Sequence, residues 1–205
     1  WNGTTTSVAN SKTVDKQTYN ASVTESPATI DGYTAVSDES KTITIGTGKN
    51  EIIFYYYKNV ELTAKSAEFV YNGLDQSVTG FTGAPEDADF DAITVGATGK
   101  DVGKYPAKFK DGTVNTVDAT EKYIVTAAND GLLKITRRAV TVTVVGNHAE
   151  AKYDKQPHTA AGYETYEADD ELYSLEDVDY SGNEVKAERT EVGTTYMGLT
   201  KEQYS

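Results

Sequence analysis

Three carboxylates at alternating positions, Asp87, Asp89 and Asp91, have the spacing of the start of a calcium-binding loop. Such a loop also needs a Gly after the third carboxylate and a bidentate Glu downstream. Ala92 follows Asp91 instead, so the pattern is incomplete. Calcium remains the one candidate cofactor, with these three residues as ligands. The alternative is a solvated strand edge whose charge opposes aggregation.

A second set of candidates consists of tyrosines, whose rings can stack on sugars while their hydroxyls donate or accept hydrogen bonds. An exposed group of them would form a glycan-binding platform, whereas buried or scattered tyrosines would only support the fold. The candidate ligand-binding residues are Tyr33, Tyr55 and Tyr57 in the first part of the chain, and Tyr163, Tyr166 and Tyr173 in the last part.

The sequence has few of the residue types that catalysis needs, and those present form no recognisable catalytic motif. The two histidines, His148 and His158, align with Ser66 and Gln76 in an earlier copy of the same repeat, described below. The chain has no cysteine, no HExxH zinc motif, no G-x-S-x-G elbow and no phosphate-binding loop. Carboxylates are abundant, but no pair is singled out as a glycosidase pair. No spacing identifies a Lys–Asn isopeptide crosslink. We therefore predict that the chain is not an enzyme.

Composition restricts the partners and the fold. A net charge of −13 argues against nucleic acid and against an anionic membrane surface, because both attract clustered Lys and Arg. No segment is long and apolar enough for membrane insertion. Charge of this size favours a soluble monomer. Only 38% of the 205 residues are apolar, and Thr, Val, Tyr and Gly dominate, which predicts an all-β fold without one large core.

The elements that must position these residues repeat within the chain. Tyr71 and Gly80 match Tyr153 and Gly162, each 82 residues later. Further along, the segment EDADF at 86–90 matches EDVDY at 176–180, now 90 residues later. An insertion of about eight residues around ETYEADDELYSL in the second copy accounts for the change. The chain therefore contains two copies of one β module.

The repeats divide the chain into three predicted domains. Residues 59–138 form a complete repeat that ends with an Asn-Asp-Gly hairpin turn and a strand over 132–136. Residues 139–205 form a second repeat without the last hairpin, which is expected to be either a cut domain or one completed by the continuing chain. Residues 1–58 form a different β module, with strands over QTYNASVTE and KTITIGTG and turns at Asp31-Gly32. A further turn is predicted at Asp111-Gly112.

The first module ends in the aromatic run NEIIFYYYKN at 50–59. In a strand, alternate side chains face opposite sides, so Ile52, Phe54 and Tyr56 would fill a small core while Ile53, Tyr55 and Tyr57 face a neighbour or solvent. We interpret this run as the closing strand of the module. A glycan-stacking strip is the alternative.

This first module resembles the later part of the mucin-binding-protein (MucBP-like) repeats of Gram-positive surface adhesins, in which an I-x-GY element precedes a terminal N-x-I-x-FYY strand. The matching residues are Ile30, Gly32, Tyr33, Asn50, Ile52, Phe54, Tyr55 and Tyr56. The family's first strands have no counterpart before Trp1, so an N-terminally trimmed module is expected. The two repeats, with FVYNGLDQSVTGF and DVGKYPAKF, are similar to Ig-like or MBG-type β repeats of large surface proteins.

The resemblance implies tandem small β modules, β-grasp-like or Ig-like sandwiches, in an elongated rod. It also implies an extracellular, cell-wall-anchored adhesin that acts as a stalk, binds host mucin or another glycoprotein, or does both. Two alternatives stay open at this point: a module that binds immunoglobulin or another host protein through a sheet edge, and an accessory module of a secreted carbohydrate-active enzyme.

Overall fold

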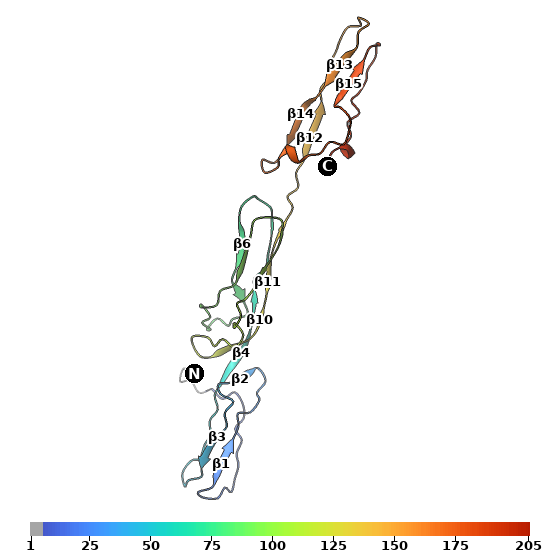
Figure 1. The fold of residues 1–205 in the computed structure, drawn as a ribbon. Helices are drawn as coiled ribbons and strands as arrows, with labels where there is room; N and C mark the ends of the chain where they lie inside the picture. Colours follow the sequence, from blue (N-terminus) through green and yellow to red (C-terminus); the bar gives the residue numbers. More distant parts are fainter. Residues whose placement is uncertain (1–5) are drawn as a thin grey trace. The chain divides into compact units, whose positions relative to one another are not determined.

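The computed structural model describes residues 6–205, which form an all-β protein, as the composition predicts (Figure 1). The only helical elements in this range are two short 3-10 turns, η1 (Leu175–Asp177) and η2 (Lys201–Gln203). Neither turn has the length or the apolar character needed to cross a membrane. The chain divides into two compact units, one up to Thr136 and one from Arg137 to Ser205.

In residues 6–136 the first unit contains eleven strands in four small sheets. One sheet has the order β10-β4-β2, with β7 also paired to β4, and another has the order β5-β11-β9. The other two sheets are the pairs β1-β3 and β6-β8. Their bounds are β1 Ser22–Glu25, β2 Tyr33–Ala35, β3 Lys41–Thr44, β4 Tyr56–Ala64, β5 Ala67–Val70, β6 Gln76–Thr79, β7 Phe81–Thr82, β8 Gly96–Gly99, β9 Gly103–Ala107, β10 Tyr123–Asn129 and β11 Gly131–Thr136.

Strand β4 links the two predicted modules of this unit. It pairs antiparallel with β2 through residues 56–58 and parallel with β10 through residues 58–63. The predicted boundary after Lys58 therefore lies inside a continuous strand. The predicted closing strand over 50–58 begins only at Tyr56, although the N–H of Val36 already donates to the carbonyl of Tyr55 at 2.9 Å. The predicted strands on either side of Asp31-Gly32 form in part, over Ser22–Glu25 and Lys41–Thr44, and they pair as β1 with β3.

The core of the first unit rests on the alternation of β4. Val60, Leu62 and Ala64 are buried while the residues between them are exposed, as expected for a strand with one face on a core. Leu62 packs with Phe90 and with Val125 of β10, and both Leu62 and Val125 are fully buried. Burying each such side chain contributes about 1.5–3 kcal/mol to stability. A single polar–apolar alternation thus specifies which face of β4 carries the fold.

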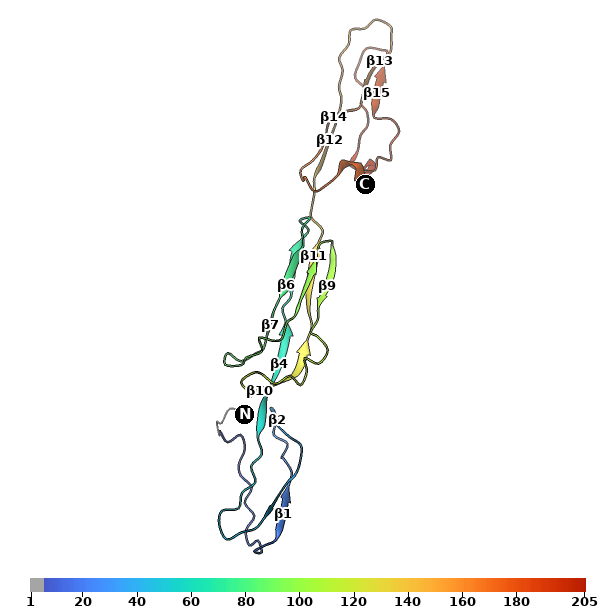
Figure 2. The ribbon, with the colours of Figure 1, turned by 60° about the vertical axis from the view of Figure 1, so that its left-hand side comes forward.

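The predicted hairpin at Asn129-Asp130-Gly131 is wrong. β10 pairs parallel with β4, and β11 continues in parallel with β5, so the chain bends at Asp130 without reversing. β11 also pairs antiparallel with β9, next to which it lies in Figure 2. The tripeptide is a turn-forming sequence, but its two flanking strands pair with other strands instead of with each other: β10 pairs with β4, and β11 pairs with both β5 and β9. Gly112 does adopt a positive φ of 87°, in agreement with the predicted turn there.

The second unit has two ribbons, β12–β14 and β13–β15 (Figure 1). The bounds are β12 Val142–Gly146, β13 His158–Ala161, β14 Tyr163–Ala168 and β15 Lys186–Arg189. Their registers reproduce those of the first repeat. Ala64 pairs with Phe81, and the residues 82 positions later, Gly146 and Tyr163, pair likewise.

The second offset is reproduced as well. In β6–β8 Gln76 pairs with Gly99, and in β13–β15 His158 pairs with Arg189, which lie 82 and 90 residues later. The two copies therefore share strand register at both sequence offsets.

The two copies differ in how deeply their side chains are buried. The first repeat contains the fully buried side chains Leu62, Val125, Leu133 and Ile135. Within residues 137–205, all of which are described, no residue reaches the buried class. Two of the four most buried side chains lie on β11 and one on β10, and no strand of 137–205 corresponds to either. The second repeat thus has the same framework without its most buried layer.

Candidate ligand-binding sites

The predicted calcium ligands do not come together as a cation site. Asp87 accepts a hydrogen bond from the Tyr123 hydroxyl at 2.7 Å and forms an ion pair with Lys122 at 3.0 Å. Asp89 accepts the backbone N–H of Asp91 at 3.2 Å. In residues 6–205 no group of three His, Cys, Asp or Glu residues is arranged to hold a metal ion. The structure therefore gives the calcium prediction no support: the Asp87 carboxylate contacts Lys122 and Tyr123, and the Asp89 carboxylate accepts the backbone N–H of Asp91.

The electrostatics of Asp87 agree with this role. The hydrogen bond from Tyr123, with a further contribution from Lys122, holds the pKa of the Asp87 carboxyl below its ordinary value. The same hydrogen bond raises the pKa of Tyr123 to about 12. The pair fixes the loop that carries EDADF against the start of β10.

A carboxylate that the sequence did not single out, Asp118, organises the same loop from inside. Only 2% of Asp118 is exposed, and its Oδ1 accepts the backbone N–H groups of Lys122 and Tyr123, each at 2.8 Å. Its Oδ2 accepts the N–H of Asp89 at 3.3 Å, the N–H of Thr120 at 3.1 Å and the Thr120 hydroxyl. Burial alone would raise the pKa of Asp118, but these hydrogen bonds bring it below its ordinary value. Asp118 is a structural carboxylate whose oxygens accept hydrogen bonds from its own loop, residues 120–123, and from Asp89.

The first three candidate tyrosines do not form one platform. Tyr33 of β2 pairs with Lys58, and Tyr57 of β4 pairs with Thr34. Because directly opposed residues share a face and successive residues alternate, Tyr33 and Tyr57 point to opposite faces of the sheet. Tyr55 precedes β4, where the Lys41 ammonium lies 5.7 Å from its ring centroid. All three tyrosines are half-buried.

Two of the other three tyrosines do come together. The rings of Tyr163 and Tyr166 stack with centroids 4.8 Å apart and planes 20° apart. Residues three apart on a regular strand face opposite sides, but a bulge on β14, where Tyr163 pairs with Gly146 and Thr165 with Val145, rotates Tyr163 onto the face of Tyr166. Tyr173 is half-buried in the following loop.

Two further tyrosines, which the sequence did not single out, complete this cluster. The Tyr204 hydroxyl donates to the Tyr163 hydroxyl at 3.2 Å, and the Tyr204 ring lies 5.0 Å from the ring of Tyr180. Partial burial, followed by the hydrogen bond with Tyr163, raises the pKa of Tyr204. Burial also raises the pKa of Tyr166. We call Tyr163, Tyr166, Tyr180 and Tyr204 the tyrosine cluster.

The repeat alignment gives the tyrosine cluster a structural counterpart. Tyr163 and Tyr180 occupy the positions of Phe81 and Phe90 in the first repeat. Phe90 is a buried member of that core, and Phe81 packs against it. The cluster therefore takes the place of an apolar core, and its rings are half-buried for that reason.

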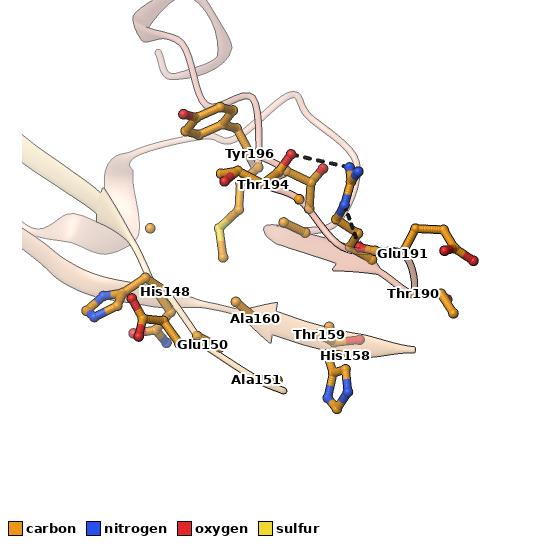
Figure 3. Close-up of a pocket in the computed structure, with 18 of the residues that line it drawn as sticks. His148, Glu150, Ala151, His158, Thr159, Ala160, Thr190, Glu191, Thr194 and Tyr196 are labelled. Atoms are coloured by element: carbon orange, nitrogen blue, oxygen red, sulfur yellow. Dashed lines mark hydrogen bonds between the residues drawn. The ribbon is translucent and has the colours of Figure 1, made fainter. Parts of the chain in front are cut away.

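The second unit also contains a groove of about 890 Å³ (Figure 3). Figure 3 shows Ala151 and Ala160 on one wall and Thr194 and Tyr196 on the other. The rim over 191–194 is held by Arg189, whose guanidinium donates to the carbonyl oxygens of Glu191, Val192 and Thr194 at 2.8–3.3 Å. The predicted tyrosines Tyr163, Tyr166 and Tyr173 do not line this groove.

Comparison of the chain with protein-family models, with curated proteins and with solved structures finds no match. The resemblance to MucBP-like and MBG-type repeats therefore stays a prediction made from the motifs alone.

Proposed function

We propose that this chain is a segment of an extracellular bacterial surface adhesin, in which repeated β modules act mainly as a spacer. The observation that carries the proposal is the reproduction of strand register, at offsets of 82 and 90 residues, in two consecutive copies. A repeat of this kind adds length for each copy without requiring a new fold. A net charge of −13 supports the same role, because like charge keeps neighbouring copies on a surface from associating.

The positions of the candidate tyrosines favour spacing over glycan binding. A glycan platform needs several exposed rings on one face beside polar side chains. All six candidates are half-buried, Tyr33 and Tyr57 face opposite sides of a sheet, and Tyr163 and Tyr166 stack on each other. A ring face that is stacked on another ring or covered by the protein cannot stack on a sugar.

Binding assays test the proposal directly. We expect the chain to bind neither immobilised intestinal mucin nor immunoglobulin above the level of a heat-unfolded sample. Saturable mucin binding that free glycan competes away would replace the spacer proposal with an adhesive one. Binding to immunoglobulin alone would favour the host-protein-binding alternative.

A second assay gives the spacer proposal a positive readout. The chain is placed between a cell-surface anchor and a reporter-binding domain, and capture of ligand-coated beads is measured. We expect capture to increase when residues 6–205 are present and to fall in a version that ends at Thr136. Equal capture with and without the chain would argue against a spacing role.

A further inference from the structure

We infer that the groove of residues 137–205 is a binding site for one extended β-strand with the sequence pattern of β11, added parallel to residues 149–152 and antiparallel to residues 193–197. Polypeptide outside 137–205 must supply this strand, because the structure has no strand of 137–205 at that place.

The position of the groove carries the inference. In the first repeat β11 lies between two segments: it pairs with β5 over residues 67–70 and with β9 over residues 103–107. The counterparts of these segments, at the offsets of 82 and 90, are residues 149–152 and 193–197. All nine of these residues line the groove. The groove therefore lies between the same two segments that β11 joins in the first repeat.

The local structure of residues 193–197 points the same way. Their counterpart, β9, is a five-residue strand in the first repeat, held by antiparallel pairing with β11. Residues 193–197 belong to no strand, although the sequences DVGKYPAKF and EVGTTYMGL align without a gap. A strand cannot form there without a partner, since backbone N–H and C=O groups need ladder partners. We attribute the difference to the pairing partner rather than to the sequence of the segment.

The chemistry of the walls defines the occupant. The groove-lining residues Ala149, Ala151 and Ala160 are small, and the apolar side chains of Met197 and Leu199 also line it, beside Gly146, where an added Cβ would lie 2.7 Å from the Met197 sulfur. In the first repeat the side chains that β11 buries are Leu133 and Ile135, which are 0% and 1% exposed. The occupant therefore needs large aliphatic residues at alternate positions, with polar residues between them.

An ion pair in the first repeat predicts the register in which the occupant binds. Lys134 of β11 forms an ion pair with Glu68 of β5 at 2.9 Å. The counterpart of Glu68 is Glu150, which lines the groove and is labelled in Figure 3. We therefore expect a cationic residue of the occupant, placed between its two buried aliphatic residues, to lie opposite Glu150.

The test uses the whole chain and a synthetic peptide with the sequence of residues 122–137. We expect saturable binding and slower amide hydrogen exchange at residues 149–152 and 193–197. A peptide carrying Leu133→Asp and Ile135→Asp should bind at least about tenfold more weakly, because it would bury unpaired charges. Binding without protection of residues 193–197, or equal binding of both peptides, would overturn the inference.

Two variants of the chain provide a matched control. Ala160→Trp on β13 fills the groove, whereas Ala161→Trp on the same strand changes an exposed neighbour that does not line it. We expect peptide binding to be lost in the first variant and retained in the second. A charge exchange adds a register test: the Lys134→Glu peptide should bind about twofold to fivefold more weakly, and Glu150→Lys in the chain should restore its binding. Equal effects of the two tryptophans would contradict the proposed site.

A covalent version covers the case in which the free peptide is too weak a ligand. Ser205 exchanges backbone hydrogen bonds with Asp179 at 2.9 and 3.1 Å, and in the first repeat Ala119 donates to Asp89, the counterpart of Asp179, at 2.9 Å. Residues 120–138 are therefore appended after Ser205, which places the strand at the corresponding point. We expect protection at residues 193–197 in this extended chain. Absence of protection in both the peptide and the extended form would refute the inference.

Discussion

Replacement of Asp118 by Asn should destabilise the first unit selectively and in a pH-dependent manner. Each carboxylate oxygen of Asp118 accepts two backbone N–H groups, and Oδ2 also accepts the Thr120 hydroxyl. An Asn side chain keeps the shape but turns one acceptor into an NH₂ group that faces two N–H donors. A buried donor left without an acceptor costs about 1–3 kcal/mol, so we expect a loss of about 2–4 kcal/mol.

The pH dependence follows from the lowered pKa of Asp118. The folded state favours the charged carboxylate, so its contribution is fully present above the unfolded pKa of about 3.9 and is lost as pH falls through the folded pKa. The difference between the wild-type chain and Asp118→Asn should therefore be largest near neutral pH and shrink below about pH 4.

The assay is urea denaturation with amide hydrogen exchange read at β4 and β10, because an optical signal would mix the two units. Asp111→Asn is the matched control, since Asp111 is exposed and Asn suits its turn equally well. It should change stability by less than about 0.5 kcal/mol at any pH. A deficit of Asp118→Asn that equals that of the control, or that is as large at pH 3 as at pH 7, would refute the reasoning.

Three further predictions concern packing. Gly83→Ala should destabilise the first unit at least twice as much as Gly112→Ala in urea unfolding. Both residues have positive φ, which alone costs an alanine about 1–2 kcal/mol. Only at Gly83 would the added Cβ also lie 2.0 Å from a carbonyl oxygen of β4. Leu133→Ala, at a fully buried position, should cost about 2–5 kcal/mol, whereas Leu74→Ala, at a position 67% exposed, should cost almost nothing in the same assay. Tyr204→Phe should remove one phenol that ionises above the ordinary range, because burial raises the pKa of Tyr204; an alkaline ultraviolet titration unchanged by the mutation would contradict this.

Local signals in the sequence predicted the fold class and several elements correctly. The composition predicts strands, and Asp-Gly pairs predict turns at residues 31–32 and 111–112, where the structure has turns. The aligned motifs predicted two copies of one module, and their offsets agree with the registers of β6–β8 and β13–β15. These features depend on neighbouring residues or on self-similarity, both of which are visible in one chain.

The candidate sites were less predictable for an identifiable reason. The sequence predicts Tyr163, Tyr166 and Tyr173 as candidates for an exposed platform, but a bulge on β14 stacks Tyr163 on Tyr166, and Tyr204 contacts Tyr163 from the end of the chain. Asp118 gave no signal at all, because its importance lies in the N–H groups that surround it. The spacing of Asp87 predicts a calcium ligand, but its carboxylate forms an ion pair with Lys122 and accepts the Tyr123 hydroxyl, neither of which is near it in the sequence.

The sequence by itself determined that this protein is all-β, acidic and built from a repeated module, because strand period, charge and repetition are properties of the chain order. Only the tertiary structure decided which strands pair. A strand with one apolar face can satisfy its backbone with any partner of suitable length, so local pattern cannot distinguish a hairpin at Asp130 from parallel pairing of β10 with β4 and of β11 with β5. That choice buries Val125 and Leu133 in the first repeat, and the lack of the corresponding strands in residues 137–205 leaves the groove.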